Sequence, residues 1–390
     1  MLCLAAPGAG GSSAAARGVA PSAPVRSDFA VGIADQKAAF FDDPRFTALD
    51  IHYARRAVSW DALTSDWQRA ELDQWMAKAQ AAGVAPLLTM EHSRLAGQTK
   101  VLPTPDQLVE QFRALRARYP WVTDFSAWNE ANCRCQATWN KPALVATYWK
   151  RMRADCPDCR VLGADLVDVD GMIEWTKRFL RAAGRQPAYW GVHNYVSANN
   201  FSTQSTVDLL KATTGEIWFT ETGGVVARRS KYSHAKIPQG VGHAADTIRF
   251  ILQTLAGLSP RVTRAYFYQW NSSSGTDSWD SSFVAANGTV RPSLDVVKQF
   301  LAGHPGPPPP VIPAPVPPVA PALDADAAQA ADGQQPQTHE EAGHREEGRP
   351  GVRPGHPGDE ALANALEHVG DGVDVGDLAQ PRLEQLLRRI

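Results

Sequence analysis

Two glutamates, Glu130 and Glu221, lie about 90 residues apart, and each follows a short apolar run. Glu130 lies in Trp-Asn-Glu-Ala-Asn at 128–132, and Glu221 lies in Phe-Thr-Glu-Thr-Gly-Gly at 219–224. Two carboxyl groups about 5 to 5.5 Å apart can cleave a glycosidic bond with retention, because one protonates the leaving oxygen and the other attacks the anomeric carbon. The pair therefore predicts sugar chemistry, if folding brings the two together. The alternative for each is a solvated surface glutamate.

The composition permits a large globular enzyme. The chain has 390 residues, of which 44% are hydrophobic and 12 are tryptophan, enough for a substantial core. Lysine and arginine number 39 against 41 acidic residues, a formal net charge of -2. This balance gives no bulk attraction to nucleic acid or to an anionic membrane, so we expect a neutral substrate. No stretch approaches the roughly 18 apolar residues of a membrane span.

Residues 29–303 alternate short apolar runs with amphipathic segments, which favours parallel strands covered by helices. Eight runs are typical of strands: 29–34, 54–60, 85–90, 122–128, 160–164, 189–195, 216–220 and 263–270. Helical periodicity fills several of the intervals. Leu72, Trp75, Met76 and Ala79, for example, recur at spacings of three and four residues before Gly83. Eight such units in about 275 residues predict an α/β fold, a (β/α)8 TIM barrel.

In such a barrel, catalytic groups collect at the carboxyl ends of the strands, and the two glutamates end the predicted fourth and seventh strands. The motifs at 128–132 and 219–224 resemble those of a large clan of retaining glycoside hydrolases, which have (β/α)8 barrels with a catalytic Glu on strands four and seven. The resemblance covers residues 29–303 in architecture but only a few residues in each motif. It implies that Glu130 is the acid/base and Glu221 the nucleophile.

These two roles require different protonation states at one pH. Glu221 must be anionic to attack, and we expect its charge to raise the pKa of Glu130, so that Glu130 holds a proton until the bond breaks. The glycosyl ester then removes that charge, and Glu130 can ionise and act as base toward water. We expect this double displacement to need no cofactor and no metal ion.

Three further residues are candidates for supporting the pair. The resemblance implies that Asn129 hydrogen-bonds the sugar 2-hydroxyl, and a strand-end cap is the alternative. In Gly-Val-His-Asn-Tyr at 191–195, His193 and Tyr195 share one face of the predicted sixth strand by the period of two. The resemblance implies that Tyr195 hydrogen-bonds the nucleophile. A structural histidine and a packed tyrosine are the alternatives.

The second, third and eighth strands supply three more candidates. Arg55, in Arg-Arg-Ala-Val-Ser-Trp at 55–60, resembles the clan's arginine that supports the nucleophile through a charge-assisted bond. Its spacing to Trp60 favours it over Arg56, although one of the two could be an outer salt-bridge partner. Trp270 is a candidate for the aromatic floor beneath the sugar, with core packing as the alternative. His92 is a candidate contact for the sugar.

Other polar and aromatic residues fit weaker interpretations. Trp139, Trp279 and Tyr232 could line further sugar subsites from loops. The acidic cluster of Asp165, Asp168 and Asp170 could bind a cation, but it lacks the spacing of a calcium loop and is more typical of a polar loop and a helix cap.

Four cysteines form two close pairs, Cys133 with Cys135 and Cys156 with Cys159. Together they resemble a four-thiolate zinc site. The predicted helix between them would span about 20 Å at about 1.5 Å per residue, which separates the pairs. Two local disulfides and an oxidising compartment are therefore the favoured interpretation, with free thiols as the alternative.

The two ends of the chain differ in composition from the middle. Residues 1–28 are rich in Ala, Ser and Gly and are interpreted as the truncated remnant of a secretory signal, or as a disordered leader in a cytoplasmic protein. Residues 304–321 are predicted to be a semi-rigid Pro-rich linker. Residues 322–390 are predicted to be a low-complexity tail without a stable core, either wall-facing or produced by out-of-frame translation.

Taken together, these patterns predict a secreted, monomeric retaining glycosidase that cleaves β-linked polysaccharide or oligosaccharide, with endo action favoured over exo action. Its expected partner is a carbohydrate, with association to a cell wall as a further expectation, and we expect neither nucleic acid binding nor a membrane span. The alternative function is a non-catalytic carbohydrate-binding barrel or a cell-wall scaffold.

Overall fold

The computed structural model describes residues 24–229 and 237–314. Most of the predicted leader, part of the predicted linker, the whole tail and Tyr232 lie outside the described residues, and the predictions for them stay predictions. One compact unit, whose described residues are 24–229 and 237–312, contains the barrel. Its last helix is α9 (Pro292–Gly303), and 304–314 form no helix or strand.

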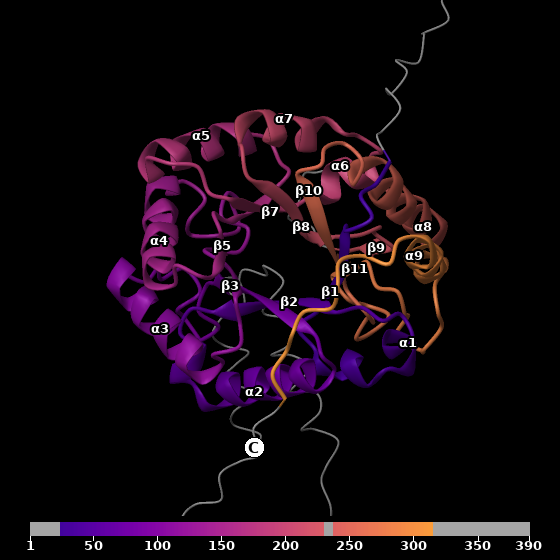
Figure 1. Ribbon diagram of the computed structural model, residues 1–390, viewed down its shortest axis with the longest axis horizontal. Coiled ribbons are helices and arrows are strands. Elements are labelled where there is room, and N and C mark those ends of the chain that lie inside the picture. Colours follow the sequence, from indigo (N-terminus) through magenta and orange to yellow (C-terminus); the bar gives the residue numbers. More distant parts are fainter. Residues whose placement is uncertain (1–23, 230–236, 315–390) are drawn as a thin grey trace, which may run out of the picture. The chain divides into compact units, whose positions relative to one another are not determined.

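The centre of this unit is a sheet of parallel strands surrounded by helices (Figure 1). Nine strands pair in the order β5-β4-β3-β2-β1-β10-β8-β7-β6. Their bounds are β1 (Ala30–Ala34), β2 (Tyr53–Ser59), β3 (Ala85–Glu91), β4 (Asp124–Ser126), β5 (Arg160–Leu162), β6 (Asp165–Val167), β7 (Tyr189–His193), β8 (Glu216–Thr222) and β10 (Val262–Tyr268). The predicted (β/α)8 barrel is therefore confirmed.

The eight predicted strands become nine because the fifth is interrupted at residues 163–164. Its first part, β5, pairs with β4, and its second part, β6, pairs with β7. Between them, the Gly163 N–H donates to the Tyr189 carbonyl at 2.9 Å, and the Ala164 carbonyl accepts from Gly191 at 3.0 Å. One stretch of chain thus joins both edges of the sheet and closes the barrel.

Helices cover the outside of the barrel because one face of each is apolar. The main ones are α2 (Asp66–Ala81), α3 (Pro105–Arg118), α4 (Pro142–Asp155), α5 (Met172–Ala183), α7 (Gln204–Ala212), α8 (Val241–Phe250) and α9. The predicted stripe on α2 is buried, with Trp75 fully inaccessible. Thr104 begins α3 with a capping box, in which its hydroxyl accepts from the Gln107 N–H and the Gln107 side chain accepts from the Thr104 N–H.

Smaller elements complete the described chain. They are the 3-10 turns Ala38–Asp42 and Ala62–Thr64, α1 (Pro44–Thr47), α6 (Tyr195–Asn199), a π-helical turn at Ile251–Leu255, and an antiparallel pair of β9 (Ala227–Arg228) with β11 (Trp279–Asp280). No helix among the described residues is both long and apolar enough to cross a membrane.

Buried side chains fill the interior of the barrel toward the amino-terminal ends of its strands. Tyr53, Trp218 and Tyr266 form a buried cluster there, and the Arg264 guanidinium lies 4.0 Å from the centre of the Trp218 ring. The charge of Arg264 is balanced by Asp124 at 2.8 Å. In barrels of this kind, substrate chemistry takes place at the carboxyl ends of the strands.

The predicted fourth, sixth and eighth strands each end two residues too late, because the observed strands stop at Ser126, His193 and Tyr268, and the first two of these errors bear on the candidate pair and its neighbours. The fourth strand stops at Ser126, so Glu130 lies in a turn beyond it rather than at its end. The sixth predicted strand stops at His193, and Tyr195 begins α6, so the period of two does not relate these residues. In both places, polar side chains and loop hydrogen bonds replace the ladder, which apolar patterning does not detect.

Gly191 offers a test of how closely β7 packs against the strand that closes the barrel. A Cβ at Gly191 would lie 2.0 Å from Oδ1 of Asp165 and 2.7 Å from Oγ1 of Thr220. We expect Gly191→Ala to lower the free energy of unfolding by about 1–3 kcal/mol or more, because a buried carboxylate must move. As control, Gly242→Ala in α8 meets nothing within 4 Å and should raise it by up to about 1 kcal/mol. Equal stabilities by chemical denaturation would contradict this packing.

Candidate active site

Glu130 is held at the carboxyl ends of the strands by a strained turn. Its backbone has φ of 47°, the left-handed region that a non-glycine residue adopts only at a cost of the order of 1 kcal/mol. Hydrogen bonds on both sides fix this geometry. The Asn129 N–H donates to the Met90 carbonyl at 2.7 Å, and the Ala131 N–H donates to the Asp165 carbonyl at 2.9 Å. The side chain of Glu130 is consequently aimed by β3 and β6.

The two glutamates converge on one histidine. Nδ1 of His193 lies 3.2 Å from Oε1 of Glu130 and 3.9 Å from Oε2 of Glu221. Because 3.2 and 3.9 Å are measured from the same atom, these carboxylate oxygens cannot be more than about 7.1 Å apart. This limit accommodates the separation of about 5 to 5.5 Å that retaining glycosidases use. Both carboxylates are partly exposed, with 29% and 18% of the side chain accessible.

Arg55 joins the nucleophile candidate to its neighbours. Its guanidinium donates to Oε2 of Glu221 at 3.0 Å and to Oδ1 of Asn129 at 2.6 Å. Arg56 points the other way, 3.6 Å from Glu71. The structure therefore places Arg55 in the site and Arg56 outside it, as the strand alternation requires. Asn129 is held in the site by two hydrogen bonds. Its side-chain oxygen accepts from Arg55, and its amide nitrogen donates to Oε2 of Glu91 at 3.4 Å.

Asp165 is the site residue that the sequence interpretation missed. Its carboxylate is fully buried and accepts from Arg55 at 2.8 Å, from Thr89 at 3.0 Å and from Ser126 at 2.8 Å. Burial alone would raise its pKa, but the charge of Arg55 and the hydrogen bond of His193 hold that pKa well below its usual range. The available signal was its position, because Asp165 follows the predicted fifth strand directly. Asp165 therefore forms an internal ion pair with Arg55 instead of a cation site with Asp168 and Asp170.

The surroundings of His193 favour its protonated, positively charged form. Its complete burial opposes that charge, but the charge of Glu221 and the hydrogen bonds to Asp165 and Glu130 outweigh burial and raise its pKa to about 9. Nδ1 then donates to Glu130 at 3.2 Å, and Nε2 faces Asp165 at the ion-pair distance of 3.7 Å. Nη2 of Arg55 lies 3.3 Å from Nε2, and both side chains share the Asp165 carboxylate, at 2.8 Å from Arg55 and 3.7 Å from Nε2.

The protonation of Glu130 differs from the sequence prediction. Burial raises its pKa, as expected for a proton donor, but the hydrogen bond and the charge of His193 outweigh burial and lower that pKa below its ordinary value. The predicted increase caused by Glu221 is therefore wrong for the unliganded site. The physical reason is the imidazolium, which separates the two carboxylates.

Tyr195 reaches Glu221 from the first turn of α6. Its hydroxyl donates to Oε1 of Glu221 at 3.3 Å. Burial, followed by the charge of Glu221, raises the pKa of Tyr195 well above 10, so the phenol keeps its proton. Asp168 supports this turn by accepting from the backbone N–H groups of Val196 and Ser197 at 3.0 and 2.7 Å. Asp168 thus binds the first turn of α6, a later helix, rather than capping α5, whose N-cap is Gly171 without a side-chain cap bond. Burial raises the pKa of Asp168 to about 6.

The aromatic candidates divide into buried and accessible residues. Trp270 is 1% exposed, donates to Asp43 and packs edge-on against Phe46. It therefore lies in the core, which was the alternative to its interpretation as the floor beneath the sugar. Tyr268, which ends β10 and is partly exposed, is the aromatic at that strand end. Trp279 packs against Tyr195 with ring centres 4.7 Å apart, and Trp139 is 44% exposed. His92 is buried directly after β3.

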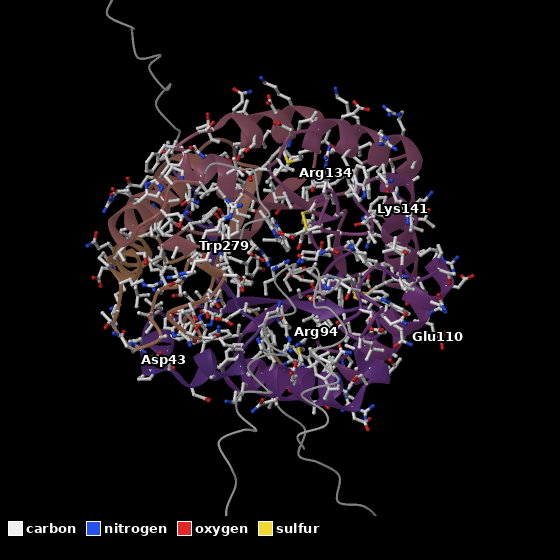
Figure 2. The ribbon with its side chains drawn as sticks, turned by 180° about the vertical axis from the view of Figure 1, so that it is seen from behind. Asp43, Arg94, Glu110, Arg134, Lys141 and Trp279 are labelled. Atoms are coloured by element: carbon white, nitrogen blue, oxygen red, sulfur yellow. A yellow bond between two sulfur atoms is a disulfide. The ribbon has the colours of Figure 1, made fainter. Side chains whose placement is uncertain are left out.

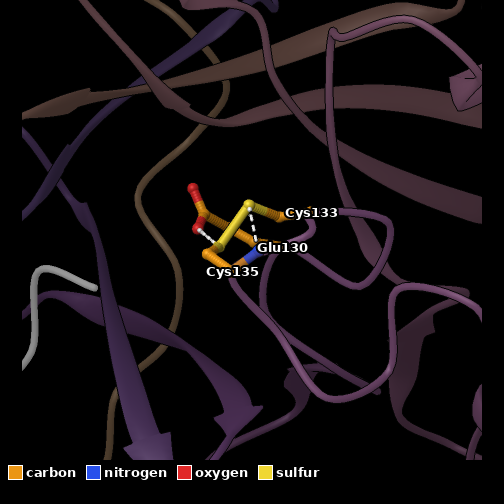
Figure 3. Close-up of side chains that lie close together, drawn as sticks. All are labelled: Glu130, Cys133 and Cys135. Atoms are coloured by element: carbon orange, nitrogen blue, oxygen red, sulfur yellow. Dashed lines mark hydrogen bonds between the residues drawn. A yellow bond between two sulfur atoms is a disulfide. The ribbon is translucent and has the colours of Figure 1, made fainter. Parts of the chain in front are cut away.

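Both predicted disulfides are present, and one borders the site (Figure 3). Cys133 is bonded to Cys135, and Cys156 to Cys159. Sγ of Cys135 lies 3.5 Å from Oε2 of Glu130, a contact rather than a hydrogen bond because a disulfide sulfur has no proton. Glu130, Cys133 and Cys135 bring three ligand atoms within 4.8 Å. Soft metals require thiolates, and the disulfide removes them, so this cluster does not fit a metal in its oxidised form.

Comparison with solved structures defines the class of fold. A GH39 β-xylosidase from Caulobacter crescentus superposes with a TM-score of 0.52 at 17% identity, over 72% of this chain and 73% of its own. Xylanase 10B from Thermotoga maritima matches with a TM-score of 0.52 at 10% identity, over 71% and 96%. The endo-1,4-β-xylanase XylE from Penicillium canescens gives 0.53 at 11%, over 70% and 94%.

These similarities show that the chain has the barrel fold of the glycoside hydrolases that it resembles in its two Glu motifs. Searches with the sequence found no matching family model and no matching curated protein.

The charge on His193 predicts a pH dependence of stability. Its folded pKa of about 9 exceeds the ordinary 6.5, so the stabilisation is complete below about pH 6.5 and is lost as the pH rises through 9. We expect a loss of the order of 3 kcal/mol across this window. Urea denaturation between pH 6 and 9.5 measures it, with His193→Gln as the comparison. A variant with the same slope as the wild type would contradict a charged His193.

Proposed function

We propose that this protein is a retaining glycoside hydrolase that cleaves β-linked polysaccharides or oligosaccharides by double displacement. The observation that carries the proposal is the convergence of Glu130 and Glu221 on His193 at the carboxyl ends of the barrel strands. Two partly exposed carboxylates a few ångströms apart on this face can lie on opposite sides of one glycosidic bond. The barrel fold and the two motifs give independent support.

In this mechanism, Glu221 is the nucleophile. Arg55 donates to one of its oxygens at 3.0 Å and Tyr195 to the other at 3.3 Å, so the carboxylate is oriented by two neighbours with different charges. Arg55 forms an ion pair with one oxygen of Glu221, and Tyr195, whose raised pKa keeps it protonated, fixes the second oxygen. Attack on the anomeric carbon forms a glycosyl ester at Glu221.

Glu130 protonates the leaving oxygen, and His193 supplies the proton. In the unliganded site the proton resides on the imidazolium, 3.2 Å from Oε1 of Glu130. It passes from Nδ1 to Glu130 and from there to the glycosidic oxygen as the bond breaks. The ester neutralises Glu221, whose charge raises the pKa of His193, so the neutral imidazole becomes favoured at this point. Glu130, again a carboxylate, accepts a proton from the water that attacks the anomeric carbon and breaks the ester bond to Glu221. Glu221 leaves as a carboxylate, and the proton on Glu130 returns to His193.

The substrate and the location follow from weaker observations. Trp139 and Trp279 are accessible beside the site and support a cleft with several subsites, hence endo action. Xylan is the first substrate to test, because the structures compared are described as a xylosidase and xylanases. The two disulfides support secretion into an oxidising compartment. A monomer associated with a cell-wall polysaccharide completes the proposal.

Variants of the two glutamates test the proposal. Glu221→Ala and Glu130→Ala should each lower kcat on a β-glycan by about 10²-fold or more, since each removes a group that acts in the transition state. A glycoside with an acidic phenol as leaving group should rescue the first step of Glu130→Ala only, because that leaving group needs no proton. Glu174→Gln, on the surface of α5, is the control and should retain full activity.

Azide identifies the role of each glutamate. With Glu130→Ala, azide should release a glycosyl azide of retained configuration, because it replaces the water of the second step. With Glu221→Ala, it should give the inverted azide, because it replaces the missing nucleophile. Product NMR distinguishes the two. Binding of glycans without any release of reducing ends by the wild type would refute the enzyme and favour the non-catalytic carbohydrate-binding barrel.

A further inference from the structure

The segment that follows Glu130 has a charge unlike that of the whole chain. Residues 131–141 contain Arg134 and Lys141 and no acidic residue, although the chain has a net charge of -2. Hydrogen bonds and the disulfide fold this segment tightly against the site. The Cys133 N–H donates to the Glu130 carbonyl at 2.8 Å, and the Gln136 N–H donates to the Cys133 carbonyl at 3.0 Å. Lys141 lies against α5, beside Arg178 and Arg181, so Arg134 is the cation of this segment that stands near Glu130.

Arg134 is the residue that this loop presents. It lies between the two bonded cysteines, one residue from the sulfur that is 3.5 Å from Oε2 of Glu130. Figure 2 shows Arg134 around the mouth of the barrel together with Arg94 and Trp279. These residues follow β3, β4 and β10 in the chain, so this is the face at the carboxyl ends of the strands.

The guanidinium of Arg134 is exposed and stacked but has no ionic partner. Its central carbon lies 5.7 Å from the centre of the Trp139 ring, and no carboxylate of the described residues lies within salt-bridge distance of it. Arg94, by contrast, also stacks on a tryptophan but is neutralised by Glu71 at 2.9 Å. A guanidinium held over an indole keeps its planar edge of N–H donors free for a carboxylate.

We propose that Arg134 is a specificity residue that recognises a carboxylate on the leaving-group side of the bond, so that the preferred glycan carries uronic acid residues there. The inference rests on the proposed function, because the acid/base Glu130 marks the side on which the leaving group lies. The disulfide fixes the loop, and Trp139 orients the guanidinium, so little side-chain freedom is lost on binding. The neutral substrate expected from net charge is thereby replaced by one with a local negative group.

The experiment compares each uronate-containing β-glycan of a panel with the same glycan after chemical reduction of its carboxyl groups. For the wild type we expect kcat/KM to be about 10-fold to 100-fold higher on the acidic form, the range of one charge-assisted hydrogen bond. Arg134→Gln should abolish most of this ratio, and Arg134→Lys should retain part of it. The preference should also weaken as salt is added.

Arg185→Gln is the matched control. Arg185 lies 5.2 Å from the ring of Trp149, but it follows α5 at the opposite end of the barrel, so its loss should leave the ratio unchanged. Hydrolysis with equal kcat/KM on acidic and reduced glycans, or an Arg134→Gln ratio equal to that of the wild type, would overturn the inference and leave the hydrolase standing. Absence of hydrolysis on every glycan would overturn the proposed function and this inference with it.

Discussion

The ion pair between Arg55 and Asp165 is the interaction on which the rest of the site depends. Both groups are almost completely inaccessible, and burying two charges is costly unless their remaining donors and acceptors are satisfied. Here they are, because Thr89 and Ser126 donate to Asp165, while Arg55 extends to Glu221. The ion pair also explains why residue 191 is glycine, because a larger residue there would collide with the Asp165 carboxylate.

Around this pair, charges of opposite sign alternate. Three carboxylates, those of Glu130, Asp165 and Glu221, surround the two cations Arg55 and His193. With every group ionised, the cluster has one negative charge in excess. In the proposed reaction this excess favours the positive charge that develops on the sugar ring. It also favours the protonated form of His193, which complete burial alone would oppose.

The turn after β4 concentrates covalent and conformational constraint in a few residues. Glu130 has a left-handed backbone, and the disulfide between Cys133 and Cys135 begins three residues later. A reacting group must be held within about half an ångström of its productive position. A loop without regular structure provides this only if hydrogen bonds or covalent bonds restrict it. The same restriction fixes Arg134, which connects catalytic geometry to the proposed choice of substrate.

Local pattern in the sequence determined the barrel, the order of its strands along the chain and the candidate pair, because burial imposes a period on each strand and helix. It also singled out Arg55 over Arg56, since neighbours on a strand face opposite sides. Tertiary structure alone decided the partnership of Asp165 with Arg55, the turn that carries Glu130 and the charge of His193. These depend on groups brought together from strands far apart in the chain, and a pKa is set by such neighbours and by burial, which no local period encodes.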